Sequence, residues 1–195
     1  MTKIIKNSSG QGLLEMVFAI GILMIAVSAI LALTTSNVIG QKESESQIIA
    51  NNLAREGIEV VRNQRDANWL SGSAWDFGLS GSGGGLSSLT AIPVFDRAAN
   101  SWELDFRADT ATTVNIFGGV YNQQKIGEAA DGSPTPFSRL LTIYNICQRS
   151  DGTESVEVDC GEDNKIGVKV ESKVNWIERN QPRKVQVEDL LYAWK

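Results

Sequence analysis

The longest apolar stretch of the chain lies near its N-terminus. From Met16 to Leu33 the sequence has 18 residues without a charge, and almost all of them are aliphatic. About 20 apolar residues of helix cross the hydrocarbon core of a bilayer, so the run reaches that length only if it begins near Leu13 and includes Glu15. A lone carboxylate in a membrane costs on the order of 3 kcal/mol and usually needs a partner. The pattern predicts a transmembrane half-helix over residues 11–35 that carries one costly charge.

The helical pattern continues over residues 36–68, but there it is apolar on one side only. Four apolar residues recur at helical spacing and share a stripe with Gly57: Ile49, Leu53, Val60 and Val61. Charged residues occupy much of the remaining surface. Because an apolar stripe must be buried, we expect this amphipathic half-helix to pack on the rest of the chain. Gly57 would let a strand approach closely.

Residues 69–195 predict a globular head rich in β-structure. The head begins with a loop over residues 71–88, which holds six glycines and six serines in 18 residues and lacks the spacing of a phosphate-binding loop. Beyond this loop, apolar and polar residues alternate as they do in half-buried strands. Three such segments are Trp102–Phe106, Thr113–Phe117 and Phe137–Cys147.

The clearest β-unit lies at the C-terminal end. Apolar and polar residues alternate from Val168 to Trp176 and again from Val185 to Glu188, and Arg179–Pro182 forms a turn signal between them. The sequence therefore predicts a β-hairpin here. Together with the earlier strands it predicts an antiparallel sheet of four or more strands, packed by one face on the amphipathic half-helix. The expected fold class is α+β.

The residues before the apolar run form a short basic leader. Residues 1–10 carry Lys3 and Lys6 and no acid, and they end in the small residues Ser8, Ser9 and Gly10. A conventional secretory signal has its small-residue cleavage site after the apolar run. Here the small residues precede it, so cleavage after Gly10 would keep the apolar helix in the mature chain.

This arrangement resembles the class III signal of type IV prepilins and pseudopilins. The resemblance lies in a basic leader that ends in Gly10, in Glu15 as the fifth mature residue, and in the hydrophobic helix that follows. Residues 52–59, Asn-Leu-Ala-Arg-Glu-Gly-Ile-Glu, are similar to the helix continuation of PilV-type minor pilins. The chain departs from the family pattern at Gln11 and Gly12, where the family prefers Phe or Met and then Thr, and its apolar run has no proline.

The resemblance implies a type IV pilin-like fold and a structural role. A prepilin peptidase would cleave between Gly10 and Gln11 and would methylate the new amine of Gln11. The subunit would wait as a single-pass protein in the cytoplasmic membrane, and an assembly platform would then move it into a filament of pilin subunits at the cell surface. Glu15 would be an assembly residue with no catalytic role.

The two cysteines of the chain, Cys147 and Cys160, bracket 12 residues. Type IV pilins often close a C-terminal loop with a disulfide, and this pair resembles that pattern. A pair of buried free thiols is the alternative. Residues 151–163 contain six acids, which would be enough for calcium, yet they lack EF-hand spacing and also fit a solvated acidic turn.

Composition narrows the possible functions. The chain has a net charge of −5, a pI near 4.9 and no histidine, so it lacks the commonest general base and a common metal ligand. It contains no nucleophile-elbow or zinc-protease motif and no Cys-x-x-Cys pair. Basic residues of the C-terminal hairpin are diluted by acids and give no strong nucleic-acid signal. We therefore expect no enzymatic activity, no cofactor and no metal site.

The expected function is that of a structural subunit, a minor pilin, of a type IV pilus-like filament. Two alternatives stay open. One is a pseudopilin of a type II secretion-like system, and the other is a membrane-anchored extracellular binding domain. The sequence alone does not separate roles in adhesion, motility, DNA uptake or secretion.

Overall fold

The computed structural model describes residues 11–79, 90–129 and 131–193. They form one long helix, α1 (Gln11–Leu70), and eight strands: β1 (Thr90–Asp96), β2 (Ser101–Asp105), β3 (Thr112–Phe117), β4 (Val120–Asn122), β5 (Ser133–Gln148), β6 (Glu154–Glu157), β7 (Asn164–Glu178) and β8 (Gln181–Tyr192). The strands pair antiparallel, and α1 packs on the sheet, so the expected α+β class is confirmed. The leader over residues 1–10 and the second half of the Gly/Ser-rich loop, residues 80–88, lie outside the described residues.

The chain divides into two compact units within α1, and the boundary lies between Ser46 and Gln47. Buried positions begin at Ala50, so the part of the helix from Gln47 onward belongs to the same unit as the sheet. The predicted half-helices, residues 11–35 and 36–68, are defined by hydropathy, whereas this boundary is defined by contacts. Hydropathy marks where the helix stops being apolar all round, whereas packing marks where the sheet begins to cover it.

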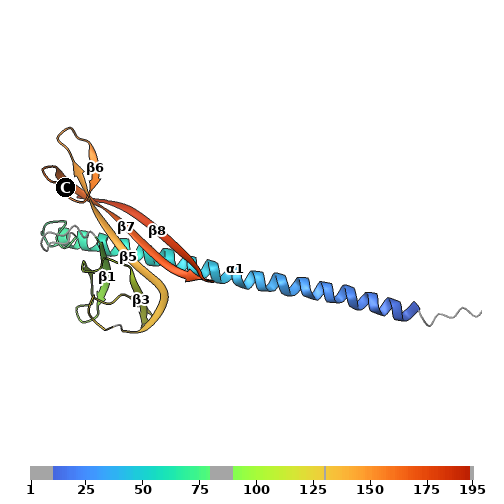
Figure 1. The fold of residues 1–195 in the computed structure, drawn as a ribbon. Coiled ribbons are helices and arrows are strands. Elements are labelled where there is room, and N and C mark those ends of the chain that lie inside the picture. Colours follow the sequence, from blue (N-terminus) through green and yellow to red (C-terminus); the bar gives the residue numbers. More distant parts are fainter. Residues whose placement is uncertain (1–10, 80–89, 130, 194–195) are drawn as a thin grey trace, which may run out of the picture. The chain divides into compact units, whose positions relative to one another are not determined.

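The long strand β5 organises the sheet of the second unit (Figure 1). Along one edge it pairs with β7, from Ser138 opposite Asn175 to Gln148 opposite Asn164. Along the other edge it pairs in turn with β3, β1 and β6. Strand β2 extends the sheet from β1, β4 extends it from β3, and β8 lies outside β7.

The predicted C-terminal hairpin is confirmed, but its turn is shorter than the four residues expected. Glu178 pairs with Gln181, and the two residues between them, Arg179 and Asn180, have positive φ angles of 50° and 61°. This is the backbone of a two-residue type I′ turn, whose twist matches that of the flanking strands. Pro182, which had been expected in the turn, lies in β8 opposite Ile177. An outer strand tolerates proline because its free edge needs no hydrogen-bond donor.

The apolar stripe of the amphipathic half-helix is buried against the sheet, as its spacing predicts. Two core clusters join the helix to β5 and β7. In one, Ile58 and Val61 pack with buried residues of the sheet, and in the other Ala50, Leu53 and Ala54 do so. The sheet side of these clusters includes Phe137, Leu141, Ile143, Val168, Val170, Val174 and Trp176.

Gly57 lies in a close contact between the helix and the sheet, which confirms its expected role. A Cβ atom built at Gly57 would lie 2.7 Å from Cδ2 of Leu141 and 2.8 Å from Oγ of Ser172. Both neighbouring side chains are fully buried. Any larger residue at position 57 must therefore push the helix away from β5 and β7.

One charge is buried in the same interface. Arg139 of β5 is fully buried, and its Nη1 atom donates to the carbonyl oxygen of Leu53 at 2.8 Å and to Oε1 of Glu56 at 3.2 Å. Its Nε atom donates to Oε1 of Gln123 at 2.8 Å. Burial lowers the pKa of Arg139, and the carboxylate of Glu56 opposes that shift. The guanidinium thereby ties the helix to the sheet and to the segment after β4.

We predict that Gly57→Leu lowers the free energy of unfolding by about 1–3 kcal/mol because it overpacks the contact with Leu141 and Ser172. Leucine is a better helix former than glycine, so helix propensity works against this loss. The measurement is urea denaturation of the full-length chain in detergent, followed by tryptophan fluorescence. Gly40→Leu is the matched control because a Cβ there meets nothing within 4 Å. Equal losses in both variants would contradict the prediction.

Candidate assembly surface

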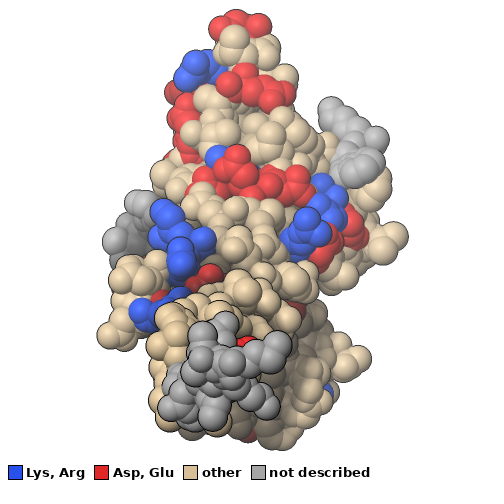
Figure 2. Space-filling view, turned by 90° about the vertical axis from the view of Figure 1, so that its right-hand side faces the viewer, with Lys and Arg blue, Asp and Glu red and all other residues tan. Residues whose placement is uncertain are grey.

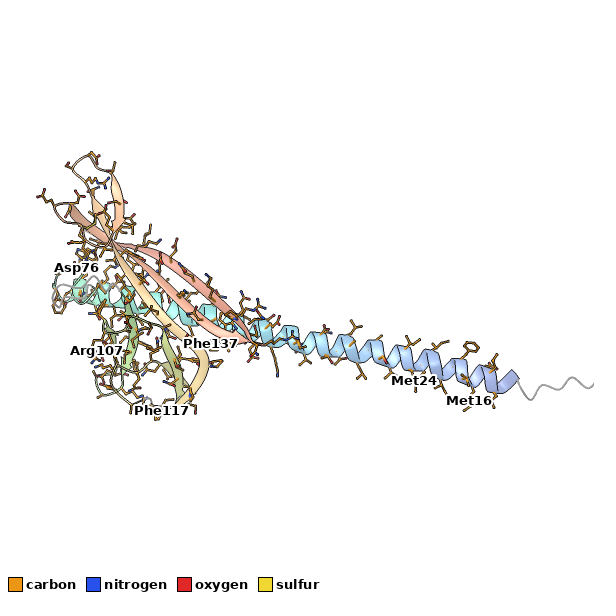
Figure 3. All side chains as sticks on the ribbon, in the orientation of Figure 1. Met16, Met24, Asp76, Arg107, Phe117 and Phe137 are labelled. Atoms are coloured by element: carbon orange, nitrogen blue, oxygen red, sulfur yellow. A yellow bond between two sulfur atoms is a disulfide. The ribbon has the colours of Figure 1, made fainter. Side chains whose placement is uncertain are left out.

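The first unit presents an apolar surface along the helix. Its large side chains are exposed at Leu13, Leu14, Met16, Val17, Phe18, Ile20, Ile22, Leu23, Met24, Ile25, Val27, Ile30, Leu31 and Leu33. Figure 3 shows Met16 and Met24 on this part of α1. This helix is long and apolar enough to cross a membrane. An apolar patch of this size marks a surface that contacts lipid or another protein.

The hydroxyl groups within and just after the apolar run are satisfied by the helix itself. Ser28, Thr34 and Thr35 each donate to the backbone carbonyl four residues earlier, at 2.8, 2.9 and 2.9 Å. A polar group left unpaired in hydrocarbon costs several kcal/mol. These internal hydrogen bonds make the surface compatible with lipid and equally with a dry protein interface.

Glu15 is the one charged residue on this surface, and its side chain is exposed. It lies four residues after Gln11, and residues four apart stand next to each other on a helix. Gln11 is the first described residue, and Gly10 lies before it, outside the described part of the chain. The backbone thus places Glu15 beside the position where the mature N-terminus would be.

The expected disulfide between Cys147 and Cys160 is present, with a Cα–Cα distance of 5.4 Å. Cys147 belongs to β5 and is buried, and Cys160 lies between β6 and β7. The bridge ties the connection between β6 and β7 to the C-terminal end of β5. The residues between the two cysteines include β6, which the sequence did not predict because four polar-rich residues carry too little periodicity.

The acidic loop, residues 151–163, is held by its own hydrogen bonds and ion pairs. Hydrogen bonds from the hydroxyl and the backbone N–H of Thr153 hold the pKa of Asp151 below its usual value. Arg149 pairs with Glu157 at 3.3 Å and with Asp163 at 3.8 Å. Within the described residues, which include this whole loop, no three acidic or sulfur side chains converge as metal ligands do.

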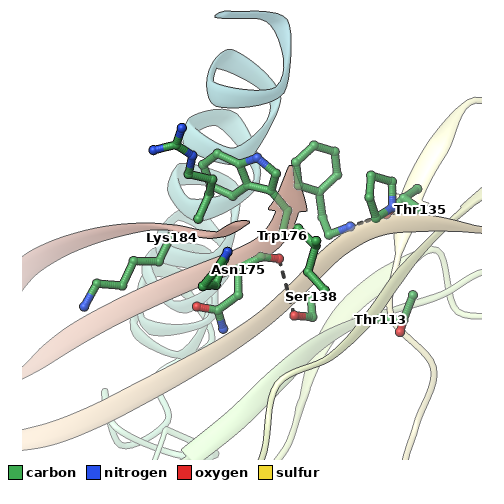
Figure 4. Close-up of a pocket in the computed structure, with 11 residues that line it drawn as sticks. Thr113, Thr135, Ser138, Asn175, Trp176 and Lys184 are labelled. Atoms are coloured by element: carbon green, nitrogen blue, oxygen red, sulfur yellow. Dashed lines mark hydrogen bonds between the residues drawn. The ribbon is translucent and has the colours of Figure 1, made fainter. Parts of the chain in front are cut away.

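A groove opens near the tip of the β7–β8 hairpin, where β5 and β7 separate beyond the pair Ser138 and Asn175 (Figure 4). We call it the fork groove. Its volume is about 540 Å³, and its lining comprises Thr113, Thr135, Pro136, Phe137, Ser138, Asn175, Trp176, Ile177, Pro182, Arg183 and Lys184. Trp176 is buried against Phe137, with ring centroids 6.0 Å apart, and no acceptor among the described residues meets its Nε1–H.

Sequence reasoning missed the fork groove. It arises because β5 carries two prolines, Pro134 and Pro136, in the part that extends beyond its pairing with β7. The alternating pattern predicts a strand only from Phe137, whereas β5 begins at Ser133. A proline-containing segment next to an alternating strand is the signal that could have indicated a strand with an unpaired edge.

No protein-family model, curated protein or solved structure matches the chain. The function of the chain is therefore inferred from its residues and their geometry.

We predict that reduction of the Cys147–Cys160 bridge lowers the free energy of unfolding by about 3 kcal/mol, because a loop of this length then regains its freedom in the unfolded chain. Denaturation of the full-length chain in detergent, with and without reductant, measures the loss. The double variant Cys147→Ala/Cys160→Ala should lose a similar amount and should not respond to reductant. Two titratable thiols in denatured, non-reduced protein from cells would contradict the bridge.

Proposed function

We propose that the chain is a structural subunit of a type IV pilus-like filament, that a prepilin peptidase cleaves it after Gly10, and that it acts as a minor pilin. The head serves as a structural and interaction module without enzymatic activity. Before assembly the subunit is anchored in the cytoplasmic membrane by its apolar half-helix, and afterwards it stands in a filament at the cell surface.

The observation that carries this proposal is the change of surface along α1. Up to Ser46 the large apolar side chains of the helix are exposed, whereas from Ala50 onward the apolar stripe is covered by the sheet. An ordinary membrane anchor needs only the first part. A subunit that moves from lipid into a protein filament needs an apolar surface that is stable in both environments. The helix meets this need because its hydroxyl groups donate to its own backbone carbonyls.

Glu15 supports the same proposal. A carboxylate in the apolar part of the helix is stabilised when a positive group pairs with it. The new amine of Gln11 is such a group. Within one chain that amine lies one helical turn away. In a filament, the carboxylate of one subunit would neutralise the amine of its neighbour, so assembly would pair two charges that lipid disfavours.

A pseudopilin of a secretion system is the second candidate. The observation that favours it is the uninterrupted helix from Gln11 to Leu70, with no proline in the apolar run. Proline-containing pilins melt the middle of this helix during assembly, and this chain has no such site. A pilus subunit will be recovered in filaments sheared from cells, whereas a pseudopilin will instead be required for export of a secreted protein.

We predict that the mature N-terminus is Gln11 and that its amine is methylated. Intact-mass and N-terminal peptide measurements on protein from the native host test this directly. Gly10→Leu should block cleavage and leave the full leader attached, while Ser9→Leu should be cleaved normally. Protein that retains Met1, or that is cut beyond Ser28, would exclude the prepilin assignment.

We predict that Glu15→Val inserts in the membrane at least as well as the wild type, because it removes a charge from the apolar helix. It should still be cleaved after Gly10, and it should lose most of its incorporation into filaments. The measurement compares its abundance in membranes and in sheared filaments. Met16→Val introduces the same side chain at the next position and should assemble normally. Normal incorporation of Glu15→Val would show that the charge is incidental.

A further inference from the structure

The fork groove has the character of a binding site for an acidic, partly apolar segment. Its walls include Phe137, Trp176 and Ile177, and the side chain of Ile177 is 70% exposed. Two cations, Arg183 and Lys184, line it, and no acid does. The buried Nε1–H of Trp176 is a donor without an acceptor among the described residues.

The acidic loop has the complementary character. Val156 of β6 and Val158, which lies in the bend directly after β6, are 48% and 45% exposed. Six acids surround these two valines within residues 151–163. Figure 2 shows red side chains gathered at the top of the molecule, the end where β6 lies in Figure 1. Apolar side chains within an acidic segment fit an apolar groove with a cationic lining.

A single chain cannot bring these two features together. The fork groove lies beyond the pair Ser138 and Asn175, whereas the acidic loop follows the other end of the same strand pair, at Gln148 and Asn164. Ten residue steps of strand separate the two ends by roughly 33 Å. The loop of one molecule can therefore occupy only the groove of another.

We propose that the acidic loop of one copy docks in the fork groove of a second copy. Val156 and Val158 pack against Trp176 and Ile177, while the loop carboxylates meet Arg183 and Lys184. We propose the head-to-tail form of this contact, in which the loop of each copy occupies the groove of the next and a free loop and a free groove remain at the ends of the chain of copies. Such a contact extends into an open polymer instead of closing into a dimer.

This proposal rests on the proposed function in one respect: it names the partner of the head within the filament. A filament of helices alone would leave the heads free to rotate about their anchors. A repeating contact from head to head would fix their register. It also predicts an association that can be measured without filaments, on purified full-length chain.

The experiment uses introduced cysteines and a short thiol-specific cross-linker. Both native cysteines are bridged, so the introduced residues supply the only reactive thiols. Full-length Val156→Cys carrying one tag is mixed in detergent with full-length Ile177→Cys carrying another, and the yield of the two-tag product is measured. Phe77→Cys replaces Ile177→Cys in the control because its side chain is equally exposed, at 70%, and lies elsewhere on the head.

We expect the pair 156 and 177 to cross-link about tenfold more than the pair 156 and 77. Arg183→Glu/Lys184→Glu in the groove partner should lower that yield about tenfold through like-charge repulsion. Glu154→Lys/Glu162→Lys in the loop partner should restore it when both double changes are combined. Equal yields for positions 177 and 77, or a charge reversal without effect, would overturn the proposal.

The same cysteine pair in sheared filaments separates this proposal from the proposed function. Filaments that contain the chain but give no cross-link between positions 156 and 177 would overturn the loop-in-groove contact and leave the filament role standing. A cross-link in detergent, together with absence of the chain from filaments, would overturn the filament role and leave the contact standing.

Discussion

The buried guanidinium of Arg139 is the interaction that holds the head together. A charge removed from water costs several kcal/mol unless its partners are in place, and here they come from separate parts of the chain. Leu53 and Glu56 belong to the helix, and Gln123 follows β4. Gln123 in turn donates to the backbone carbonyl of Arg139 at 2.9 Å. The sheet, the helix and the β3–β4 region must therefore form together, and Gly57 permits the close approach that this arrangement needs.

The helix could be predicted from the sequence because its signals are long and redundant. A charge-free run followed by a stripe at Ile49, Leu53, Val60 and Val61 gives both its length and the side that is buried. Tertiary packing adds little that could override such a pattern. The hairpin of β7 and β8 was equally clear, because its alternation continues over many residues on each side of one turn.

The parts that could not be predicted depend on contacts distant in sequence. Strand β4 has three residues and β6 has four, which is too few for a periodic pattern to show. Both form because they pair with a neighbouring strand, β4 with β3 and β6 with β5. Arg139 has no sequence signal that distinguishes it from a surface arginine. The fork groove is also invisible along the chain, since it is the gap that remains where two strands stop pairing.

The boundary between the two compact units lies inside a continuous helix, and this has a mechanical consequence. Residues 47–70 of α1 belong to the same unit as the sheet, so a pull on this part of the helix acts directly on its contacts with the sheet. The load meets the sheet first at the turn of helix that contains Ala50 and Leu53, where backbone and side chains are locked to β5 and β7. Force along this part of the helix therefore shears it against the sheet, and a shearing load is shared by many contacts at once, whereas a peeling load breaks them one after another.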